Sequence, residues 1–378
     1  VMRHVLFLAH RIPFPPNRGD KIRSHFILRA IAAQAAVHVG TLADDEFDLA
    51  EEPYLGNLAE SHCLVRRALP LPVAGLLALA KRQPVSLPAF GHPRLAAYVA
   101  QVLKTYPISA IYVFSGQMGQ YIPEDFAGRV VMDLGDVDSA KFDAYGARGH
   151  GPMAWVNARE GRLLRAEEAR LARRADATLL ISDEEAALFR SRLSGADLAA
   201  SDIRVLGNGI DSFHFDPAAV LPEPRLLESE GARLIFTGQM DYAPNVDAVV
   251  RVMERIMPRV RQAIPDATFH IVGRNPPADL LARDGENGCR VWGRVDDMRT
   301  WLKGSDLALV PLDIARGVQN KVLEAMAMAL PVVLTSGAAT GIPARDGEHF
   351  RVADSDEALA AAVIDLLADR RQAQAMGQ

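Results

Sequence analysis

Residues 316–333 combine the residue types of an anion-binding loop with those of the helix that follows it. Gly317 comes after a predicted strand that ends near Leu312, and the first N–H groups of the next helix have no acceptor inside that helix. Such a helix start suits a phosphate group. Lys321 would add a positive charge there, and Glu324 would be near enough to accept from sugar hydroxyls. From spacing alone, an ordinary loop, helix and strand with solvated Lys and Glu explains the segment equally well.

A second candidate is the Pro-rich loop at residues 15–23, which follows the first predicted strand. Gly19 permits close approach of the backbone to a ligand. Four cationic side chains make this region suited to a phosphate-bearing donor or acceptor, namely Arg11, Arg18, Lys21 and Arg23. A plain exposed basic loop is the alternative.

Repeated units of strand, loop and helix must position these residues. The buried strands predicted in the first half are residues 5–9, 37–42, 108–114, 129–134 and 177–181. Those predicted in the second half are residues 234–237, 268–272, 290–292, 307–312 and 332–335. The helices predicted between them are residues 22–33, 160–174, 245–262, 297–302 and 319–328. This alternation predicts an α/β protein with parallel sheets covered by helices on both faces.

The chain has 378 residues, a length that favours two domains. We predict an N-terminal Rossmann-like domain at residues 1–200, a second one at 201–355, and a C-terminal helix at 356–378 that is cut short. Ligands of such folds bind at the carboxyl ends of the strands. We therefore expect the two sheets to face each other across a cleft.

Composition excludes several classes of protein. With 49% hydrophobic residues, disorder is not the main state. The 42 Lys and Arg against 47 Asp and Glu give a net charge of −5, which argues against nucleic acid as a partner. The two cysteines, Cys63 and Cys289, indicate a reducing compartment and argue against a Cys-based metal site. No apolar run is long enough to span a bilayer, and we predict a cytoplasmic protein.

Residues 316–333 resemble the donor-site motif of GT-B glycosyltransferases of family 4. In that motif two Glu separated by seven residues precede Ala-Met-Ala and Pro-Val-Val. Glu324 matches the second Glu, which in the family holds the ribose of the nucleotide. Arg316 stands in place of the first Glu, so we expect it to contact diphosphate or an acidic donor sugar as a catalytic residue. The other donor-binding residues that the resemblance implies here are Gly317, Val318, Gln319, Asn320 and Lys321, with Gly19 facing the diphosphate from the N-terminal loop.

Three more segments agree with this family. Residues 204–211 resemble the Asn-Gly-Val-Asp start of the donor domain. Residues 236–245 resemble its first strand, loop and helix, with Gly238 and Gln239 in the loop and Asn245 placed to cap the helix. Many relatives carry Arg and Lys in this loop, so part of their phosphate clamp is missing. Residues 291–295 match a strand end that lies against the base, which implies backbone contacts at Gly293, Arg294 and Val295.

The sequence Asp136-Val137-Asp138 follows a predicted strand. In GT-A glycosyltransferases a D-x-D holds a metal and the diphosphate, but such short acidic patterns are common and the two-domain alternation is GT-B-like. We therefore expect no metal. Asp136 would act as a base toward the acceptor, and Asp138 would lie on the acceptor side with Arg11, Arg18 and Lys21. Helix capping and ion pairing with Lys141 explain the acidic residues equally well.

Residues 11–23, 136–141 and 316–324 together resemble the sugar transferases associated with PEP-CTERM/exosortase exopolysaccharide systems. The resemblance implies a retaining, metal-independent glycosyltransferase that uses a nucleotide-sugar as substrate, needs no cofactor, and acts on a glycan acceptor, expected to be lipid-linked. Because the first Glu and the usual cleft His are absent, two alternatives stay open. They are a degenerate protein that binds nucleotide-sugars, and a nucleotide-sugar epimerase or hydrolase.

The apolar stretch at residues 73–79 has basic residues on both sides. An apolar segment with basic flanks can bind the surface of a membrane. This predicts peripheral contact with the inner face of the membrane. A buried helix or loop is the alternative.

Overall fold

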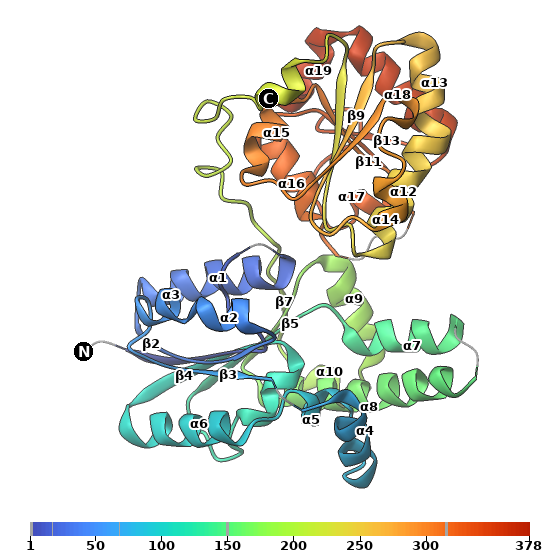
Figure 1. The fold of residues 1–378 in the computed structure, drawn as a ribbon. Helices are drawn as coiled ribbons and strands as arrows, with labels where there is room; N and C mark the ends of the chain where they lie inside the picture. Colours follow the sequence, from blue (N-terminus) through green and yellow to red (C-terminus); the bar gives the residue numbers. More distant parts are fainter. Residues whose placement is uncertain (1–2, 17, 68, 149–150, 314–316) are drawn as a thin grey trace. The chain divides into compact units, whose positions relative to one another are not determined.

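The computed structural model describes residues 3–16, 18–67, 69–148, 151–313 and 317–378. The chain divides between Gly207 and Asn208 into two compact units, each with its own sheet (Figure 1). The boundary expected from sequence lay seven residues earlier, at 200/201. Within the described ranges, no helix is both long and apolar enough to cross a membrane.

The first unit contains seven parallel strands in its described part, in the order β3-β2-β1-β4-β5-β6-β7. The strands are β1 (His4–Ala9), β2 (Ala36–Ala43), β3 (Ser61–Arg66), β4 (Ile108–Phe114), β5 (Arg129–Gly135), β6 (Ala177–Leu180) and β7 (Ile203–Val205). The winding direction reverses between β1 and β4. In open α/β sheets such a reversal opens a crevice at the carboxyl ends of the two strands.

Helices cover both faces of this sheet (Figure 1). They are α1 (Gly19–Ala32), α2 (Glu46–Ala50), α3 (Glu52–Gly56), α4 (Leu71–Ala80), α5 (Ser86–Ala89), α6 (Pro93–Thr105), the 3₁₀ turn η1 (Gly116–Tyr121), α7 (Asp138–Arg148), α8 (Pro152–Arg174), α9 (Asp183–Arg192) and α10 (Gly195–Ala199). Successive side chains of a strand point to opposite faces. Leu6 and Leu8 of β1 therefore pack in the core under α6, whereas Phe7 packs in the core under α1.

The second unit repeats the same winding. Its six parallel strands, counted over the described residues, run in the order β10-β9-β8-β11-β12-β13. They are β8 (Arg233–Thr237), β9 (Thr268–Val272), β10 (Cys289–Gly293), β11 (Leu307–Val310), β12 (Val332–Leu334) and β13 (Arg351–Val352). The reversal here lies between β8 and β11. Both predicted parallel sheets, and thus the predicted α/β class, are confirmed.

The helices of the second unit include one that differs from expectation. They are α11 (Pro224–Leu227), α12 (Ala243–Arg251), the π turn η2 (Val252–Ile256), α13 (Met257–Ala263), α14 (Ala278–Leu281), η3 (Glu286–Gly288), α15 (Met298–Gly304), α16 (Asn320–Ala327), α17 (Ser336–Ala339), α18 (Asp356–Ala368) and α19 (Arg370–Gly377). The C-terminal segment, expected as one helix, breaks at Asp369. Its carboxylate accepts from the N–H groups of Arg371 and Gln372 and so begins α19.

Candidate active site

Three glycines form the carboxyl edge of the second sheet at the ends of β8, β9 and β10. The Gly238 N–H donates to the Val272 carbonyl over 3.1 Å, and the Gly273 N–H donates to the Gly293 carbonyl over 2.9 Å. A Cβ atom added to Gly273 would lie 1.5 Å from the Gly238 oxygen. Side chains are therefore excluded at this point, and the edge presents backbone to any ligand.

Helix α16 follows β11, which lies across the winding reversal from β8, and its Lys321 side chain extends to the glycine edge. Its Nζ donates to Asn245 Oδ1 over 2.6 Å and lies 4.5 Å from the centre of the Phe236 ring. The Asn245 Nδ2 donates to the Gln239 carbonyl over 2.8 Å. A Cβ on Gly238 would lie 3.2 Å from the same Nζ. The ammonium group is thus held beside the backbone of the β8–α12 loop.

Asn245 does not cap α12, contrary to the sequence-based expectation. The helix begins at Ala243 after Tyr242, so Asn245 is its third residue and is buried. Its amide oxygen and nitrogen instead bridge Lys321 to the loop. A buried polar side chain on the apolar face of a helix needs such partners.

Lys321 and Glu324 share one turn of α16, and both are half-buried. Burial lowers the pKa of Lys321 to about 8, an effect that the nearby Glu324 carboxylate opposes. Burial likewise raises the pKa of Glu324, opposed by Lys321. Among the described residues, no hydrogen bond or ion pair ends on the Glu324 carboxylate, so its acceptor capacity is available to a ligand.

The start of α16 lies where the anion site was predicted. The helix begins at Asn320, and its first N–H groups have no acceptor within the helix. The Gln319 Nε2 donates to the Gly317 carbonyl over 3.1 Å, and Asn320 Oδ1 accepts from Asn208 over 3.3 Å. Val318 packs partly buried against the core. Arg316, the predicted catalytic residue, lies outside the described residues.

The buried side chain of Arg251 holds the segment that directly follows β11, where the loop toward α16 begins. From the end of α12 its guanidinium donates to Asp313 Oδ1, to Asp356 Oδ1 and to the Asp354 carbonyl, each over 2.6 Å. It also donates to the Pro311 carbonyl over 3.3 Å. One side chain therefore ties the segment after β11 to the segments after β13 and at the start of α18.

The predicted base-contact residues lie at the same edge. Gly293 has a φ of +70°, which favours glycine, and its carbonyl accepts from Gly273. Arg294 is exposed, whereas Val295 packs against the core. Arg274, from the neighbouring loop, has a buried Nε that bonds to no partner in the described part of the chain.

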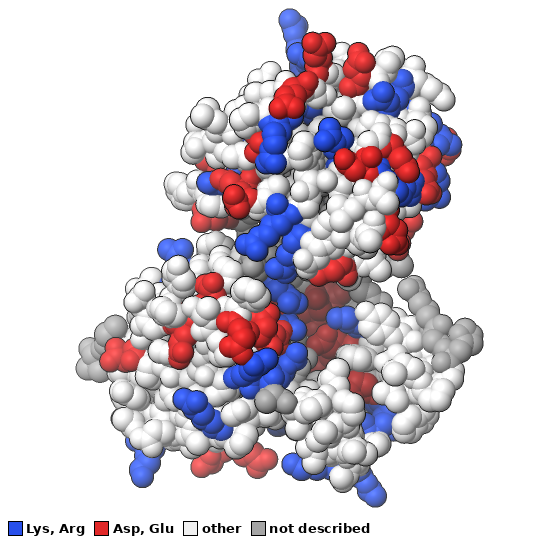
Figure 2. All heavy atoms as spheres, viewed as in Figure 1, with Lys and Arg blue, Asp and Glu red and all other residues white. Residues whose placement is uncertain are grey.

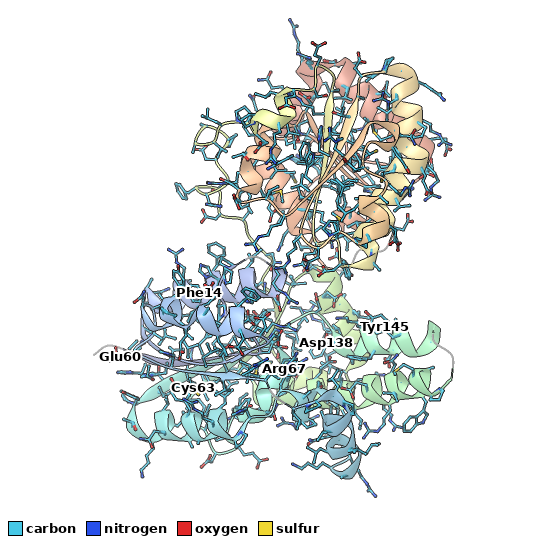
Figure 3. The ribbon with its side chains drawn as sticks, in the orientation of Figure 1. Phe14, Glu60, Cys63, Arg67, Asp138 and Tyr145 are labelled. Carbon is cyan, nitrogen blue, oxygen red and sulfur yellow. The ribbon has the colours of Figure 1, made fainter. Side chains whose placement is uncertain are left out.

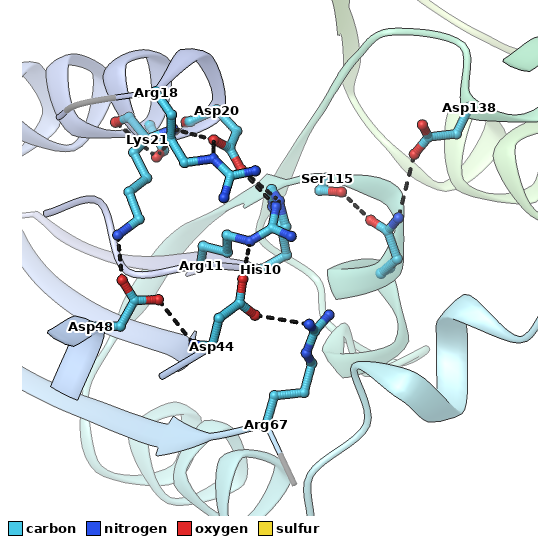
Figure 4. Close-up of polar contacts among 12 residues, drawn as sticks. His10, Arg11, Arg18, Asp20, Lys21, Asp44, Asp48, Arg67, Ser115 and Asp138 are labelled. Carbon is cyan, nitrogen blue, oxygen red and sulfur yellow. Dashed lines mark hydrogen bonds and ion pairs between the residues drawn. The ribbon is translucent and has the colours of Figure 1, made fainter. Parts of the chain in front are cut away.

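In the first unit, the predicted cationic loop is largely paired with acids (Figure 4). Arg11 donates to Asp44 over 2.5 Å and to Asp20 over 2.7 Å, and Arg18 contacts Asp20 over 2.9 Å. Burial alone would raise the pKa of Asp20, but His10, Arg18 and Arg11 lower it well below its usual range. This network surrounds the end of β1 and the start of α1, where Gly19 is the first helical residue.

Lys21 is placed differently from the acceptor-side position expected for it. It is buried, and its Nζ donates to Asp48 over 2.5 Å and to the Phe14 carbonyl over 2.9 Å. Lys21 therefore supports the loop from inside. Of the cations predicted on the acceptor side, Arg18 has the most exposed side chain, at 38%.

Asp133 is part of the core of this unit. Arg23 donates to both of its oxygens, over 2.9 and 3.0 Å, and the Tyr112 hydroxyl donates over 2.6 Å. The Asp133 side chain has no solvent exposure. Asp133 lies within β5 and serves the fold, whereas Asp136 and Asp138 come after the strand.

Asp136 and Asp138 line a small pocket of about 10 Å³ at the carboxyl edge of the first sheet. Gln117 donates to Asp138 over 3.3 Å and is itself bonded to Ser115 at the end of β4. Figure 3 shows Asp138 and Arg67 at this edge and Glu60 at the opposite one. Across the described ranges, no group of three or more His, Cys, Asp or Glu side chains could hold a metal ion.

Two carboxyl groups of this pocket have raised pKa values. Loss of hydration beside the surrounding protein, together with the negative charges of Glu185 and Asp138, raises the pKa of Asp136 to about 6. The Asp136 side chain nevertheless stays exposed. Burial raises the pKa of Glu168 to about 7, against two hydrogen bonds from Ser139. A carboxyl group with a raised pKa is a better proton acceptor once ionised, as a general base requires.

Sequence reasoning missed the partners in these networks. Asn245, Asp44 and Asp48 are short polar residues next to or within helices, where capping is the usual interpretation. Gln117 and Glu168 gave no motif. For Gln117 the signal was its position shortly after the strand β4, since a polar residue there lies at the ligand edge. Glu168 lies inside α8 and gave no signal of this kind.

Residues 231–369 match a protein-family model described as "Glycosyl transferases group 1". The matched range begins just before β8 and includes the glycine edge, Lys321 and Glu324. It identifies a glycosyltransferase domain in the second unit and confirms the expected enzyme class at that level. No protein of curated function matched the sequence.

Solved structures resemble the whole chain at low sequence identity. A sucrose-phosphate synthase from Thermosynechococcus elongatus is 16% identical, with 100% of this chain and 92% of that chain covered and a TM-score of 0.69. Anabaena Alr3699/HepE in complex with UDP-glucose is 15% identical, with 99% and 92% covered and a TM-score of 0.65. WaaG, a glycosyltransferase involved in lipopolysaccharide biosynthesis, is 18% identical, with 99% and 93% covered and a TM-score of 0.62. The chain therefore has the GT-B fold and carries a group 1 glycosyltransferase domain.

Proposed function

We propose that this protein transfers a sugar from a nucleotide-sugar to a lipid-linked glycan acceptor during exopolysaccharide synthesis, with retention at the anomeric carbon and without a metal. We also propose that it belongs to family 4, near the PEP-CTERM/exosortase-associated transferases, and that it acts at the inner face of the membrane. The resemblance of residues 11–23, 136–141 and 316–324 supports these finer assignments.

The observation that carries the proposal is the position of Lys321 beside Gly238 at the winding reversal of the second sheet, with Glu324 one turn further along α16 and Gly273 and Gly293 at the next two strand ends. A phosphate chain needs close backbone approach, a cation and free N–H groups. The glycine edge gives close backbone approach and Lys321 gives the cation. Among the described residues no acceptor is seen for the first two N–H groups of α16, those of Asn320 and Lys321. The Glu324 carboxylate, which accepts no hydrogen bond from any of the described residues, is proposed to bind the ribose hydroxyls.

The chemistry assigned to these groups is stabilisation of the leaving diphosphate. Negative charge develops on the bridging oxygen as the glycosidic bond breaks, and fixed donors lower the barrier by meeting that charge. Lys321 is held in place by Asn245 before substrate binds, so little reorganisation is needed. Arg316 is proposed to contribute a second cation.

Acceptor binding is assigned to the first unit. Asp136, whose pKa is raised to about 6, is the proposed base for the acceptor hydroxyl, with Asp138 and Gln117 as hydrogen-bonding neighbours. At neutral pH Asp136 is ionised and able to accept a proton. The exposed Arg18 is proposed to contact an acceptor phosphate.

UDP is the nucleotide to test first, because Alr3699/HepE was solved with UDP and UDP-glucose. Calorimetry with UDP should show binding by the unaltered protein and a loss of about tenfold or more in Glu324→Ala, since hydrogen bonds to a charged group contribute about 1.5–3 kcal/mol. Glu230→Ala, an exposed Glu of the same unit, is the matched control. Equal affinity in both variants would overturn the donor-site assignment.

A nucleotide-sugar panel with and without acceptor separates this function from its alternatives. Release of nucleotide only when acceptor is present supports transfer. Release without acceptor supports a hydrolase, and saturable binding without turnover supports a degenerate binder.

A further inference from the structure

Helix α4 is packed with its large side chains facing outward. Of its ten residues, only Ala74 and Ala78 are buried, both with no exposure. The large apolar side chains are exposed by 40–69%; they are Leu71, Val73, Leu76, Leu77 and Leu79. A surface helix of a water-soluble protein normally buries its leucines. This arrangement rules out the buried segment that the sequence allowed, and an uncovered apolar surface of this kind marks an interaction site.

The start of α8 extends this apolar surface. Arg159 of α8 donates to the carbonyls of Ala78 and Gln83, which attaches α8 to the C-terminal end of α4. Trp155 lies four residues before Arg159, so both side chains are on the same face of α8. Trp155 is 62% exposed, and Met153 beside it is 65% exposed.

The charges around this surface are cationic and unpaired. Lys81 and Arg82 follow α4 directly, Arg162 lies on the Trp155 face of α8, and all three are exposed. In the described part of the chain, none of the three takes part in an ion pair. Helix α4 contains no acidic residue. Figure 2 shows this part of the first unit as uncharged surface with basic side chains at its end.

We propose that α4 and the start of α8 form a docking surface for an anionic lipid bilayer. Aliphatic side chains, a Trp and flanking Lys and Arg are the composition that binds the lipid interface, because the apolar part enters the acyl boundary while the cations meet the headgroups. A second copy of the chain would bring the same cations against Lys81 and Arg82, whereas anionic headgroups neutralise them. Binding to the bilayer does not depend on the transfer reaction.

This surface gains a role if the proposed function holds. Helix α8 passes from the docking surface at Arg159 to the acceptor pocket, where Glu167 and Glu168 are lining residues. At a rise of 1.5 Å per residue, the eight residues from Arg159 to Glu167 span about 12 Å. A lipid-linked acceptor would thus reach the pocket with its headgroup while its chain stays in the bilayer.

Vesicle sedimentation of the 378-residue protein without any sugar donor tests the proposal. The protein should bind vesicles of phosphatidylcholine and phosphatidylglycerol more tightly than vesicles of phosphatidylcholine alone. Leu76→Ser combined with Leu79→Ser should weaken binding by about tenfold or more. Lys81→Gln combined with Arg82→Gln should abolish most of the preference for anionic vesicles. Phe213→Ser is the control, since Phe213 is 93% exposed in the other unit.

Each outcome decides the question. Absence of binding to anionic vesicles, or equal binding by the Leu double variant and the control, would overturn the docking surface. A dimer in light scattering that the Leu double variant abolishes, without vesicle binding, would assign α4 to a second copy instead. UDP calorimetry on the same variants should stay unchanged, so a failure of the docking proposal is distinguishable from a failure of the donor-site proposal.

Discussion

The pKa of Lys321 predicts how nucleotide-sugar affinity depends on pH. Burial lowers this pKa to about 8 in the free protein. A bound diphosphate favours the protonated ammonium and raises the pKa again. Affinity should therefore be full well below pH 8 and decline as pH rises through that value, because binding then requires uptake of a proton.

The expected magnitude follows from the fraction of charged Lys321. With a pKa of about 8, roughly 90% of the side chains are protonated at pH 7 and roughly a quarter at pH 8.5. The dissociation constant for a nucleotide-sugar should rise about fourfold over this interval. Removing the charge in Lys321→Met should weaken binding by about tenfold to a hundredfold, from a loss of about 1.5–3 kcal/mol.

Calorimetry with UDP-glucose at pH 7, 7.5, 8 and 8.5 measures this dependence, and repeating it in buffers of different ionisation enthalpy counts the protons taken up. Lys321→Met should bind weakly and without this dependence. Lys321→Arg should keep its charge throughout, since the guanidinium pKa is far above the interval. A flat affinity in the unaltered protein, or the same slope in Lys321→Met, would refute the assignment of Lys321 to the diphosphate.

Two further predictions concern the first unit. Arg23→Met should lower the free energy of unfolding of the first unit, measured by urea denaturation, by about 3–5 kcal/mol, because the buried Asp133 carboxylate loses its charged partner. A change below about 1 kcal/mol would contradict a buried ion pair. The raised pKa of Glu168, about 7, means that the folded protein holds this proton to higher pH than the unfolded chain, whose carboxyl titrates near 4.5. Stability should consequently fall between about pH 4.5 and 7 and level off above, and Glu168→Gln should flatten that decline in denaturation curves measured at pH 5, 6 and 7.

The sheets were predictable because their signal is local. A buried parallel strand is a short apolar run followed by a loop, and residues 108–114 and 268–272 were predicted with the bounds that β4 and β9 have. The start of α16 was predictable for the same reason, since the loop at Gly317 and the helix that carries Lys321 and Glu324 are adjacent in sequence; their role in donor binding stays a prediction.

Pairing over long sequence distances was not predictable. In the sequence, Lys21 and Arg11 look like unpaired cations. Their partners are distant along the chain: Asp48 is 27 residues from Lys21, and Asp44 is 33 residues from Arg11. Lys321 and Asn245 meet across 76 residues. A pattern reports which residues are charged or apolar, but only the fold decides which acid neutralises which cation and which face of an apolar helix meets solvent.

The fully buried side chains of helix α4 are those of two alanines, Ala74 and Ala78, which has a consequence for how its sequence can change. Positions with no folding role accept substitution at little cost in stability. The outer face of α4 can therefore diverge between related proteins, or be redesigned with polar residues, independently of the sheet beneath it. Such a redesigned helix should keep the fold of the first unit.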